Sequence, residues 1–253
     1  MEGVFPKLNR QGNAYQEVAE SIRTEILKGR LTLGQRLPSE QELAVQFGIS
    51  RTVVREAIRT LEGTGFVTVK KGQRGGVFVA QDYDKLVIDS IGNMVATGEV
   101  TFDDLFAVRS LVECYAVEQL ALHGSEDDFS RLKALLDDAD KALANSERIR
   151  PFNIRFHRMI ARLCRNSLLA IIGETAVTVV TSELASIVSR ETSLAHLSMH
   201  RELLAAIMAG DAELAKTLVN HDINSLKDLM GEKLPQLLRA TASTSVAQTQ
   251  AQL

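Results

Sequence analysis

The sequence is poor in the features that mark secreted and membrane-spanning proteins. Its 253 residues include only two cysteines, Cys114 and Cys164, which lie far apart and outside any C-x-x-C pattern. A disulfide framework and a cysteine-based zinc site are therefore not expected, and both thiols are predicted to pack in a core. The longest uninterrupted apolar runs, such as LLAII at 168–172, fall well short of the roughly 18 residues that a membrane helix requires.

A secretory signal is also missing from the sequence given. The segment MEGVFPKLNRQGNAY at 1–15 has no continuous apolar stretch and carries Glu2 where such signals are basic. We therefore expect a soluble, cytoplasmic protein with no membrane segment. The length is enough for two domains of ordinary size.

The chain as a whole has no excess of basic residues, since its formal net charge is −3. The charges are unevenly distributed, however. Residues 1–80 contain 12 Lys and Arg against 8 Asp and Glu, whereas residues 81–253 contain 17 against 24. This asymmetry is typical of a small anion-binding module attached to an acidic body.

Strand-like segments are almost absent after Gln81, because apolar residues keep a helical spacing for most of the remaining chain. The sequence predicts a mostly α fold, in which an N-terminal winged helix-turn-helix is followed by an all-α antiparallel helical bundle. The predicted domains are 1–80, which carries the basic excess, and 81–238, which is all-helical. The segment 239–253, rich in Ala, Ser, Thr and Gln, is predicted to be a disordered tail. Helices are expected near 82–97, 101–122, 126–145, 149–164, 167–189, 192–209 and 211–233.

The first 80 residues carry clear start and stop signals for helices. A helical pattern at 15–27 is followed by Ser39, which with Glu42 forms a capping-box arrangement. Gly48 ends that second helix and Ser50 caps a third, which runs to about residue 63. The runs FVTVK and GVFVA around KGQRGG then predict a two-stranded hairpin with a glycine-rich tip.

Basic residues gather at two places in this predicted domain. Arg51 and Arg55 lie in the first turns of the third helix, and Lys70, Lys71 and Arg74 lie at the hairpin tip. A helix-turn-helix places such an N-terminus in the DNA major groove, where arginine can hydrogen-bond guanine, and a hairpin can follow the neighbouring groove as a wing. The alternative is a small structural domain with a solvated basic rim.

These motifs resemble a known family. LPSEQELAVQFGISRTVVREAIRTLEGTGFV followed by KGQRGGVFV is similar to the winged helix-turn-helix of GntR-type bacterial regulators, and the helical remainder resembles the FCD effector domain of their FadR-like branch. The resemblance implies that 1–80 binds DNA and that 81–238 binds an effector and dimerises. It also implies a dimer on a two-fold, palindromic DNA operator. Residue 41 departs from the family pattern, because it is Gln where the family commonly has a DNA-contacting Arg. The candidate DNA-binding residues are Gln41, Ser50, Arg51, Thr52, Arg55, Lys71, Gly72 and Arg74.

Three histidines of the helical region can converge in the bundle. His157 follows Asn153 by four residues and shares its helix face, and His200 and His221 lie at equal distances from the turn at 210–211. Imidazoles grouped in this way suit zinc, nickel or a similar divalent metal. The alternative is a set of hydrogen-bonded interior or surface histidines without metal, and His196 is expected at the surface.

The resemblance implies a divalent metal at the same place, since many FCD domains hold one through an Asp and three His. This sequence has Asn153 at the Asp position. At the last His position we align Asp222, with His221 one residue earlier, so that Asp222 is the alternative ligand.

A candidate effector contact lies on the helix expected at 101–122. Arg109 and Glu113 are four residues apart on one face, and Arg109 matches the position that often reaches the FCD cavity. A buried Arg can bind a ligand carboxylate through two parallel hydrogen bonds. The alternative is an intrahelical ion pair.

These features favour a ligand-responsive transcription regulator, and specifically a repressor that a small organic acid releases or remodels. A metal-dependent enzyme is the first alternative, but no H-E-x-x-H or G-x-S-x-G motif is present and no catalytic residues are predicted. The second alternative is an architectural DNA-binding dimer without effector. A thermal-shift screen and a turnover assay would separate the three.

Overall fold

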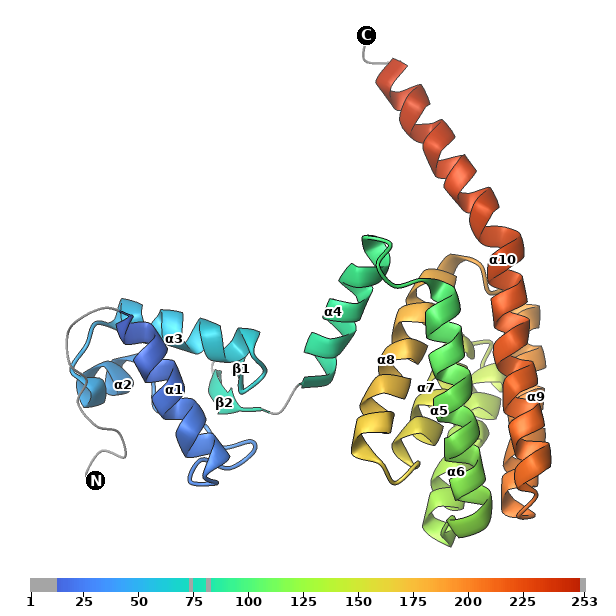
Figure 1. The fold of residues 1–253 in the computed structure, drawn as a ribbon, viewed down its shortest axis with the longest axis horizontal. Helices are drawn as coiled ribbons and strands as arrows, with labels where there is room; N and C mark the ends of the chain where they lie inside the picture. Colours follow the sequence, from blue (N-terminus) through green and yellow to red (C-terminus); the bar gives the residue numbers. More distant parts are fainter. Residues whose placement is uncertain (1–12, 73–74, 81–82, 251–253) are drawn as a thin grey trace. The chain divides into compact units, whose positions relative to one another are not determined.

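The computed structural model describes residues 13–72, 75–80 and 83–250, with side chains described up to residue 231. The chain divides into two compact units, Met1–Val87 and Ile88–Leu253. The division lies inside a helix, α4 (Tyr83–Ala96), a few residues beyond the predicted boundary at residue 80. The described residues are mostly helical, with one two-stranded sheet, as the sequence predicts (Figure 1).

The N-terminal unit has the predicted order of three helices and a hairpin. Each turn has a local cause: Ser39 and Glu42 form both hydrogen bonds of a capping box, at 3.2 and 2.7 Å, and Gly48 ends the second helix with a φ of 69°. Apolar residues of all three helices and both strands share one core. The elements are α1 (Ala14–Leu27), α2 (Glu40–Phe47), α3 (Arg51–Gly63), β1 (Val67–Lys70) and β2 (Gly76–Val79).

The capping box at Ser39 gives a stability prediction. Ser39→Ala removes the oxygen that accepts the hydrogen bond from the Glu42 amide, so the N-terminal unit is expected to lose about 1 kcal/mol of unfolding free energy. Urea denaturation followed by circular dichroism measures this loss. Thr60→Ala is the matched control, because Thr60 is exposed and bonds only within its own helix. Equal stability of the Ser39→Ala and wild-type proteins would contradict the prediction.

The C-terminal unit is a helical bundle built around α5 (Figure 1). Helix α5 packs against α7, α8, α9 and α10, and apolar side chains from these helices form a single core. Cys164 is buried in this core and Cys114 packs against it, both as free thiols, as predicted. The elements after α4 are α5 (Phe102–His123), α6 (Glu126–Ala144), α7 (Arg150–Arg162), α8 (Ser167–Glu183), a short 3-10 turn η1 (Leu184–Ser186), α9 (Arg190–Met208) and α10 (Ala212–Gln250).

One described helix is long and apolar enough by length and composition to cross a membrane, Ser167–Ser186. The sequence-based expectation missed it because polar residues interrupt its apolar runs. Half of this stretch is buried inside the bundle. At Gly173 an added Cβ would come within 2.7 Å of Val112 and 3.1 Å of Ala161, so α8 is closely packed against α5 and α7. Its buried Glu174 also forms ion pairs with α7, as expected for a core helix.

Most of the segment predicted as a disordered tail, 239–253, is drawn as the end of helix α10. Helix α10 continues through residue 250, and residues 251–253 lie outside the described part of the chain. Ala and Gln favour a helix and no Pro or Gly interrupts residues 239–250, so this composition allows a helical backbone. The segment has few large apolar residues to bury, and for that reason a tail outside the packed core stays the prediction.

Candidate functional site

The first turn of α3 presents an exposed polar surface. Ser50 caps the helix by accepting a 3.4 Å hydrogen bond from the amide of Val53, and the opposite side of the helix is buried in the core. Arg51, Thr52 and Arg55 are all exposed. The side chain of Gln41, on α2, is also exposed. The predicted contact residues of the helix-turn-helix are therefore exposed rather than packed in the core.

A carboxylate that the sequence analysis did not single out holds the two arginines. Arg55 donates two hydrogen bonds to Glu40, at 3.1 and 2.8 Å, and a guanidinium nitrogen of Arg51 lies 3.8 Å from the same carboxylate. The hydrogen bond from Arg55 is the main reason that the pKa of Glu40 lies below its ordinary value. Glu40 thus orients both guanidinium groups at the start of α3.

The hairpin forms the predicted wing. Its strands pair antiparallel from Val67 opposite Val79 to Lys70 opposite Gly76. Arg36, from the segment before α2, donates a 2.7 Å hydrogen bond to the carbonyl of Gly75 and pairs its backbone with β2. A Cβ on Gly76 would lie 2.6 Å from the Arg36 Nε, so the glycine permits this close contact. Arg36 therefore braces the wing.

The predicted wing contacts are only partly described. Lys71 and Gly72 are exposed, and Gly72 has a φ of 107° that favours glycine. Arg74 lies outside the described residues. The ammonium group of Lys70 lies 4.9 Å from the ring centre of Phe78, so that Lys70 is held against the hairpin.

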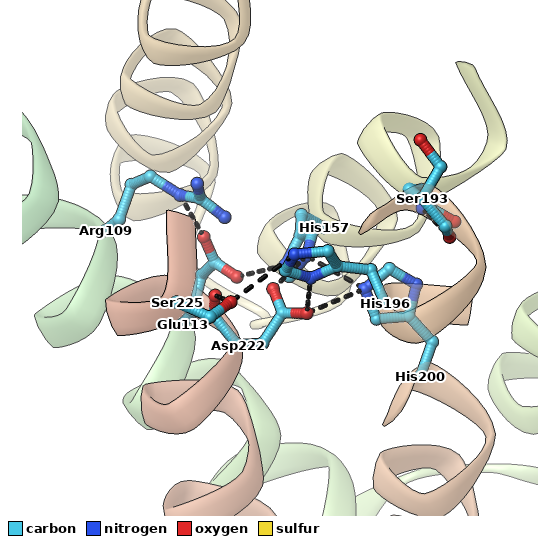
Figure 2. Close-up of polar contacts among 9 residues, drawn as sticks. Arg109, Glu113, His157, Ser193, His196, His200, Asp222 and Ser225 are labelled. Atoms are coloured by element: carbon cyan, nitrogen blue, oxygen red, sulfur yellow. Dashed lines mark hydrogen bonds and ion pairs between the residues drawn. The ribbon is translucent and has the colours of Figure 1, made fainter. Parts of the chain in front are cut away.

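The second site is a buried polar cluster inside the helical bundle. Figure 2 shows side chains from four helices that point toward one another. All of them are less than 9% exposed, although charged and polar groups are rarely buried without partners. The cluster comprises Arg109 and Glu113 from α5, His157 from α7, His196 and His200 from α9, and Asp222 from α10.

His157 lies at the centre of this cluster (Figure 2). Its Nδ1 lies 2.6 Å from a carboxylate oxygen of Glu113, and its Nε2 lies 2.8 Å from Asp222 and 3.1 Å from the Nε2 of His200. Asp222 also contacts the Nδ1 of His196 and lies 3.4 Å from the Nε2 of His200. Each carboxylate therefore faces at least one imidazole.

The arrangement sets the protonation states of the metal-free cluster. Burial opposes the charged form of His157, but the negative charges of Glu113 and Asp222 outweigh it and raise its pKa to about 9. Burial lowers the pKa of His200 to about 4 despite its contact with Asp222. Burial alone would raise the pKa of Asp222, but its imidazole partners hold it well below its ordinary value. At neutral pH His157 is therefore charged, His200 is neutral and Asp222 is ionised.

Three residues of the cluster form a possible metal site. Ligand atoms of His157, His200 and Asp222 lie within 4.8 Å of one another. The Nε2 of His157 lies 2.8 Å from one carboxylate oxygen of Asp222 and 3.1 Å from the Nε2 of His200, which lies 3.4 Å from the other oxygen of Asp222. Donor atoms this close can share an ion at bond lengths of about 2.0–2.2 Å. The imidazole and carboxylate donors suit a divalent transition metal, and Glu113 on the far nitrogen of His157 is the usual outer partner of such a ligand.

Of the two residues predicted for the last metal-binding position, Asp222 rather than His221 lies in the cluster. His221 is exposed and is not part of the cluster, whereas its neighbour Asp222, the alternative ligand, is fully buried in it. Successive residues on a helix point about 100° apart, so a shift of one position moves a side chain from solvent into the bundle. His196, expected at the surface, is also buried, four residues and one turn from His200.

Asn153 lies beside the cluster rather than among its closest ligand atoms. Its side-chain nitrogen donates a 2.8 Å hydrogen bond to the carbonyl of Ser193, and its buried side-chain oxygen has no hydrogen-bond partner among the described residues. Asn153, His157, His196 and His200 line a cavity of about 30 Å³. This volume is enough for an ion or a water molecule but not for an organic acid.

Arg109 and Glu113 form the ion pair that was the alternative to the predicted effector contact, and both side chains are fully buried. The Nε of Arg109 donates a 2.8 Å hydrogen bond to Glu113. The two terminal nitrogens of Arg109 are buried without a hydrogen-bond partner among the described residues. The ion pair uses only the Nε of Arg109, so two buried donors of the same guanidinium are left without a partner among the described residues.

Comparison with known proteins identifies both halves of the chain. Residues 14–79 match the family described as bacterial regulatory proteins, gntR family, and residues 104–225 match the FCD domain. The Uxu operon transcriptional regulator of Escherichia coli (strain K12) is 29% identical over 229 residues, which cover 86% of this chain and 87% of that protein. The Exu regulon transcriptional regulator of the same organism is 32% identical over 162 residues, covering 63% of this chain and 60% of that protein.

A solved structure agrees with these matches at the level of the fold. The structure described as Streptococcus agalactiae GntR has a TM-score of 0.55 at 23% identity, and the match covers 85% of this chain and 99% of that one. The matched families and relatives are transcription regulators rather than enzymes. This chain belongs to the GntR family of bacterial transcription regulators, with a winged helix-turn-helix and an FCD effector domain.

Proposed function

We propose that this regulator binds a palindromic operator as a homodimer in the cytoplasm, as a repressor, and that a small organic acid held in the helical unit changes its affinity for DNA. The observation that carries the DNA half is the exposed start of α3, where two arginines are oriented by one carboxylate. Arg51 and Arg55 would read base edges, while Ser50, Thr52, Gln41 and the wing residues Lys71, Gly72 and Arg74 would contact the operator around them.

The arginines of α3 give a testable prediction. Replacing Arg51 or Arg55 with Ala is expected to weaken operator binding by about 1–3 kcal/mol if a base contact is lost. Fluorescence anisotropy with an operator duplex at fixed salt measures this change. Arg59→Ala is the matched control, because Arg59 is exposed on the same helix but pairs with Glu56 two turns away from the N-terminus. Equal affinity of all three variants would exclude this surface from base recognition.

In the helical unit we propose that His157, His200 and Asp222 hold a divalent metal such as zinc or nickel, with Asn153 close enough to join them. The support is the spacing of the donor atoms and the carboxylate behind His157. A bound divalent ion would supply a Lewis acid that an organic carboxylate can ligate. Glu113 would keep the ligating nitrogen of His157 directed at the ion.

Charge balance favours an acidic ligand once the metal is present. In the metal-free cluster Arg109 and charged His157 balance Glu113 and Asp222. A divalent ion that displaces the proton of His157 leaves one positive charge uncompensated. A carboxylate would neutralise it, and the free nitrogens of Arg109 could donate to the same ligand.

Metal uptake is therefore expected to release one proton. Because the pKa of His157 is raised to about 9 and that of His200 lowered to about 4, only His157 must lose a proton between pH 5 and 8. The apparent metal affinity should rise about tenfold per pH unit over this range. Titration calorimetry in buffers of different ionisation enthalpy measures the proton count. Metal binding with no proton release would contradict the assigned charge of His157.

A thermal-shift screen tests the effector half. Metal-free protein is compared with protein given zinc or nickel, each with small carboxylates and sugar acids, because a ligand that binds the native state raises the melting temperature. A shift that needs both metal and acid supports the proposal, and release of the operator by the same acid completes it. Stabilisation by none of them would favour the alternative, a DNA-binding dimer whose bundle only dimerises.

A further inference from the structure

A second cavity, of about 490 Å³, lies next to the small cavity of the histidine cluster. Arg150, Val188 and Ser193 line both, so the two cavities are neighbours across these three side chains. The larger one reaches the surface, since exposed Arg148 and Arg190 also line it. Its volume lies in the range of small-molecule sites, about 300–1,000 Å³. It is large enough for an organic acid that the inner cavity cannot hold.

The charged side chains that line this outer cavity are all positive. Arg148, Arg150 and Arg190 line it, and no acidic residue does. Among the described residues none of the three forms an ion pair: Arg150 donates to the carbonyl of Thr181, and Arg190 to that of Glu147. Most other arginines of the helical unit that the structure describes do have a carboxylate partner: Arg109, Arg158, Arg162, Arg165 and Arg201. Three uncompensated guanidinium groups around one cavity are a site for an anion.

Two helices begin at this cavity and add to its positive potential. Arg150 opens α7 and Arg190 opens α9. The start of α7 has no side-chain cap, so its positive helix end is not satisfied locally. Arg150 is also partly buried, and burial lowers its pKa below the ordinary value, which is the mark of a cation without a counter-charge.

We propose that the outer cavity binds an acidic group of the effector, and that the effector is a small molecule with at least two anionic groups. One anionic group would ligate the metal or lie at the inner cavity, beyond Arg150. The other would lie between Arg148 and Arg190. This inference rests on the proposed effector function of the bundle, which it makes more specific. A carboxylate and a phosphate would both satisfy the arginines, so the shared requirement is a second negative charge.

The test compares succinate and butyrate, two four-carbon acids that differ by one carboxylate. Calorimetric titrations use the full-length protein in two forms, metal-free and loaded with zinc, so that the contribution of the arginines is measured with and without the metal. The wild type is expected to prefer succinate by roughly tenfold or more, since a charge-assisted hydrogen bond is worth about 1.5–3 kcal/mol. In Arg148→Gln/Arg190→Gln this preference should disappear. The control Arg131→Gln/Arg155→Gln removes the same charge from exposed positions of the same unit and should keep it.

A second control excludes the DNA-binding surface as the source of the signal. Arg51→Gln/Arg55→Gln should retain the full preference for succinate. An unchanged preference in Arg148→Gln/Arg190→Gln, or no saturable succinate binding by folded wild-type protein in either the metal-free or the zinc-loaded form, would overturn the proposal. Elemental analysis of the same variants after zinc loading reports separately on the histidine cluster, so failure of the outer cavity and failure of the metal site are distinguishable.

Discussion

Asp222→Asn is expected to abolish high-affinity metal binding, whereas His221→Ala is expected to leave it unchanged. Asp222 is fully buried against three imidazoles, and its neighbour His221 is exposed. Loss of an outer partner of a metal ligand already costs about 10–100-fold in affinity, so loss of a ligand carboxylate should cost more than about 100-fold. The two variants differ by one position in the chain and so form a matched pair.

Competition with a chromophoric zinc chelator measures both affinities. Circular dichroism confirms that each variant remains folded, and His200→Ala removes a second ligand from another helix as an independent check. If His221→Ala loses the metal and Asp222→Asn keeps it, the ligand set proposed for the bundle is wrong. If wild-type protein takes up no zinc or nickel at saturation, the cluster is a hydrogen-bonded core feature only.

Glu113→Gln is expected to produce the largest loss of stability among the substitutions considered. The carboxylate of Glu113 is fully buried between the guanidinium of Arg109 and the imidazole of His157. Its removal leaves the buried guanidinium of Arg109 without a carboxylate and leaves His157 with Asp222 as its only counter-charge. Breaking a buried pair from one side typically costs about 3–5 kcal/mol. Denaturation by urea at neutral pH should show a loss of this size for the helical unit.

Glu118→Gln is the matched control for this experiment. Glu118 lies on the same helix and pairs with Lys216 on α10 at 3.2 Å, but both side chains are partly exposed. Pairs of this kind contribute about 0–1 kcal/mol. The destabilisation by Glu113→Gln should also be relieved in part when Arg109 is replaced by Met in the same chain, because the uncompensated charge of Arg109 is then gone. Similar stability of the Glu113→Gln and Glu118→Gln proteins would contradict the buried network.

The winged domain could be predicted from the sequence because its turns are encoded locally. Ser39 with Glu42, Gly48 and Ser50 each fix one helix end through contacts within a few residues, and the structure confirms these boundaries. What the sequence did not reveal are the partners that meet across the fold. Glu40 reaches Arg55 over 15 positions and Arg36 reaches Gly75 over 39. No spacing rule connects such residues before the fold is known.

The histidine cluster was predicted in part. The four-residue spacing of Asn153 and His157 correctly places both near one cavity, and the same spacing between His196 and His200 was a signal for the burial of both. To choose between His221 and Asp222, one must know to within one residue which side of α10 faces the bundle. Helix boundaries inferred from sequence are uncertain by about 2–4 residues, so pattern alone cannot decide which neighbour faces inward.

The small volume of the inner cavity has a kinetic consequence. It holds about one water molecule, so an acid that reaches His157 from the outer cavity does so only while Arg150 and the helix starts around it have moved aside. Opening then precedes binding, and the observed association rate should level off at the opening rate as the acid concentration rises. The regulator would thus respond on the time scale of a helix movement, commonly microseconds to milliseconds, rather than on that of diffusion.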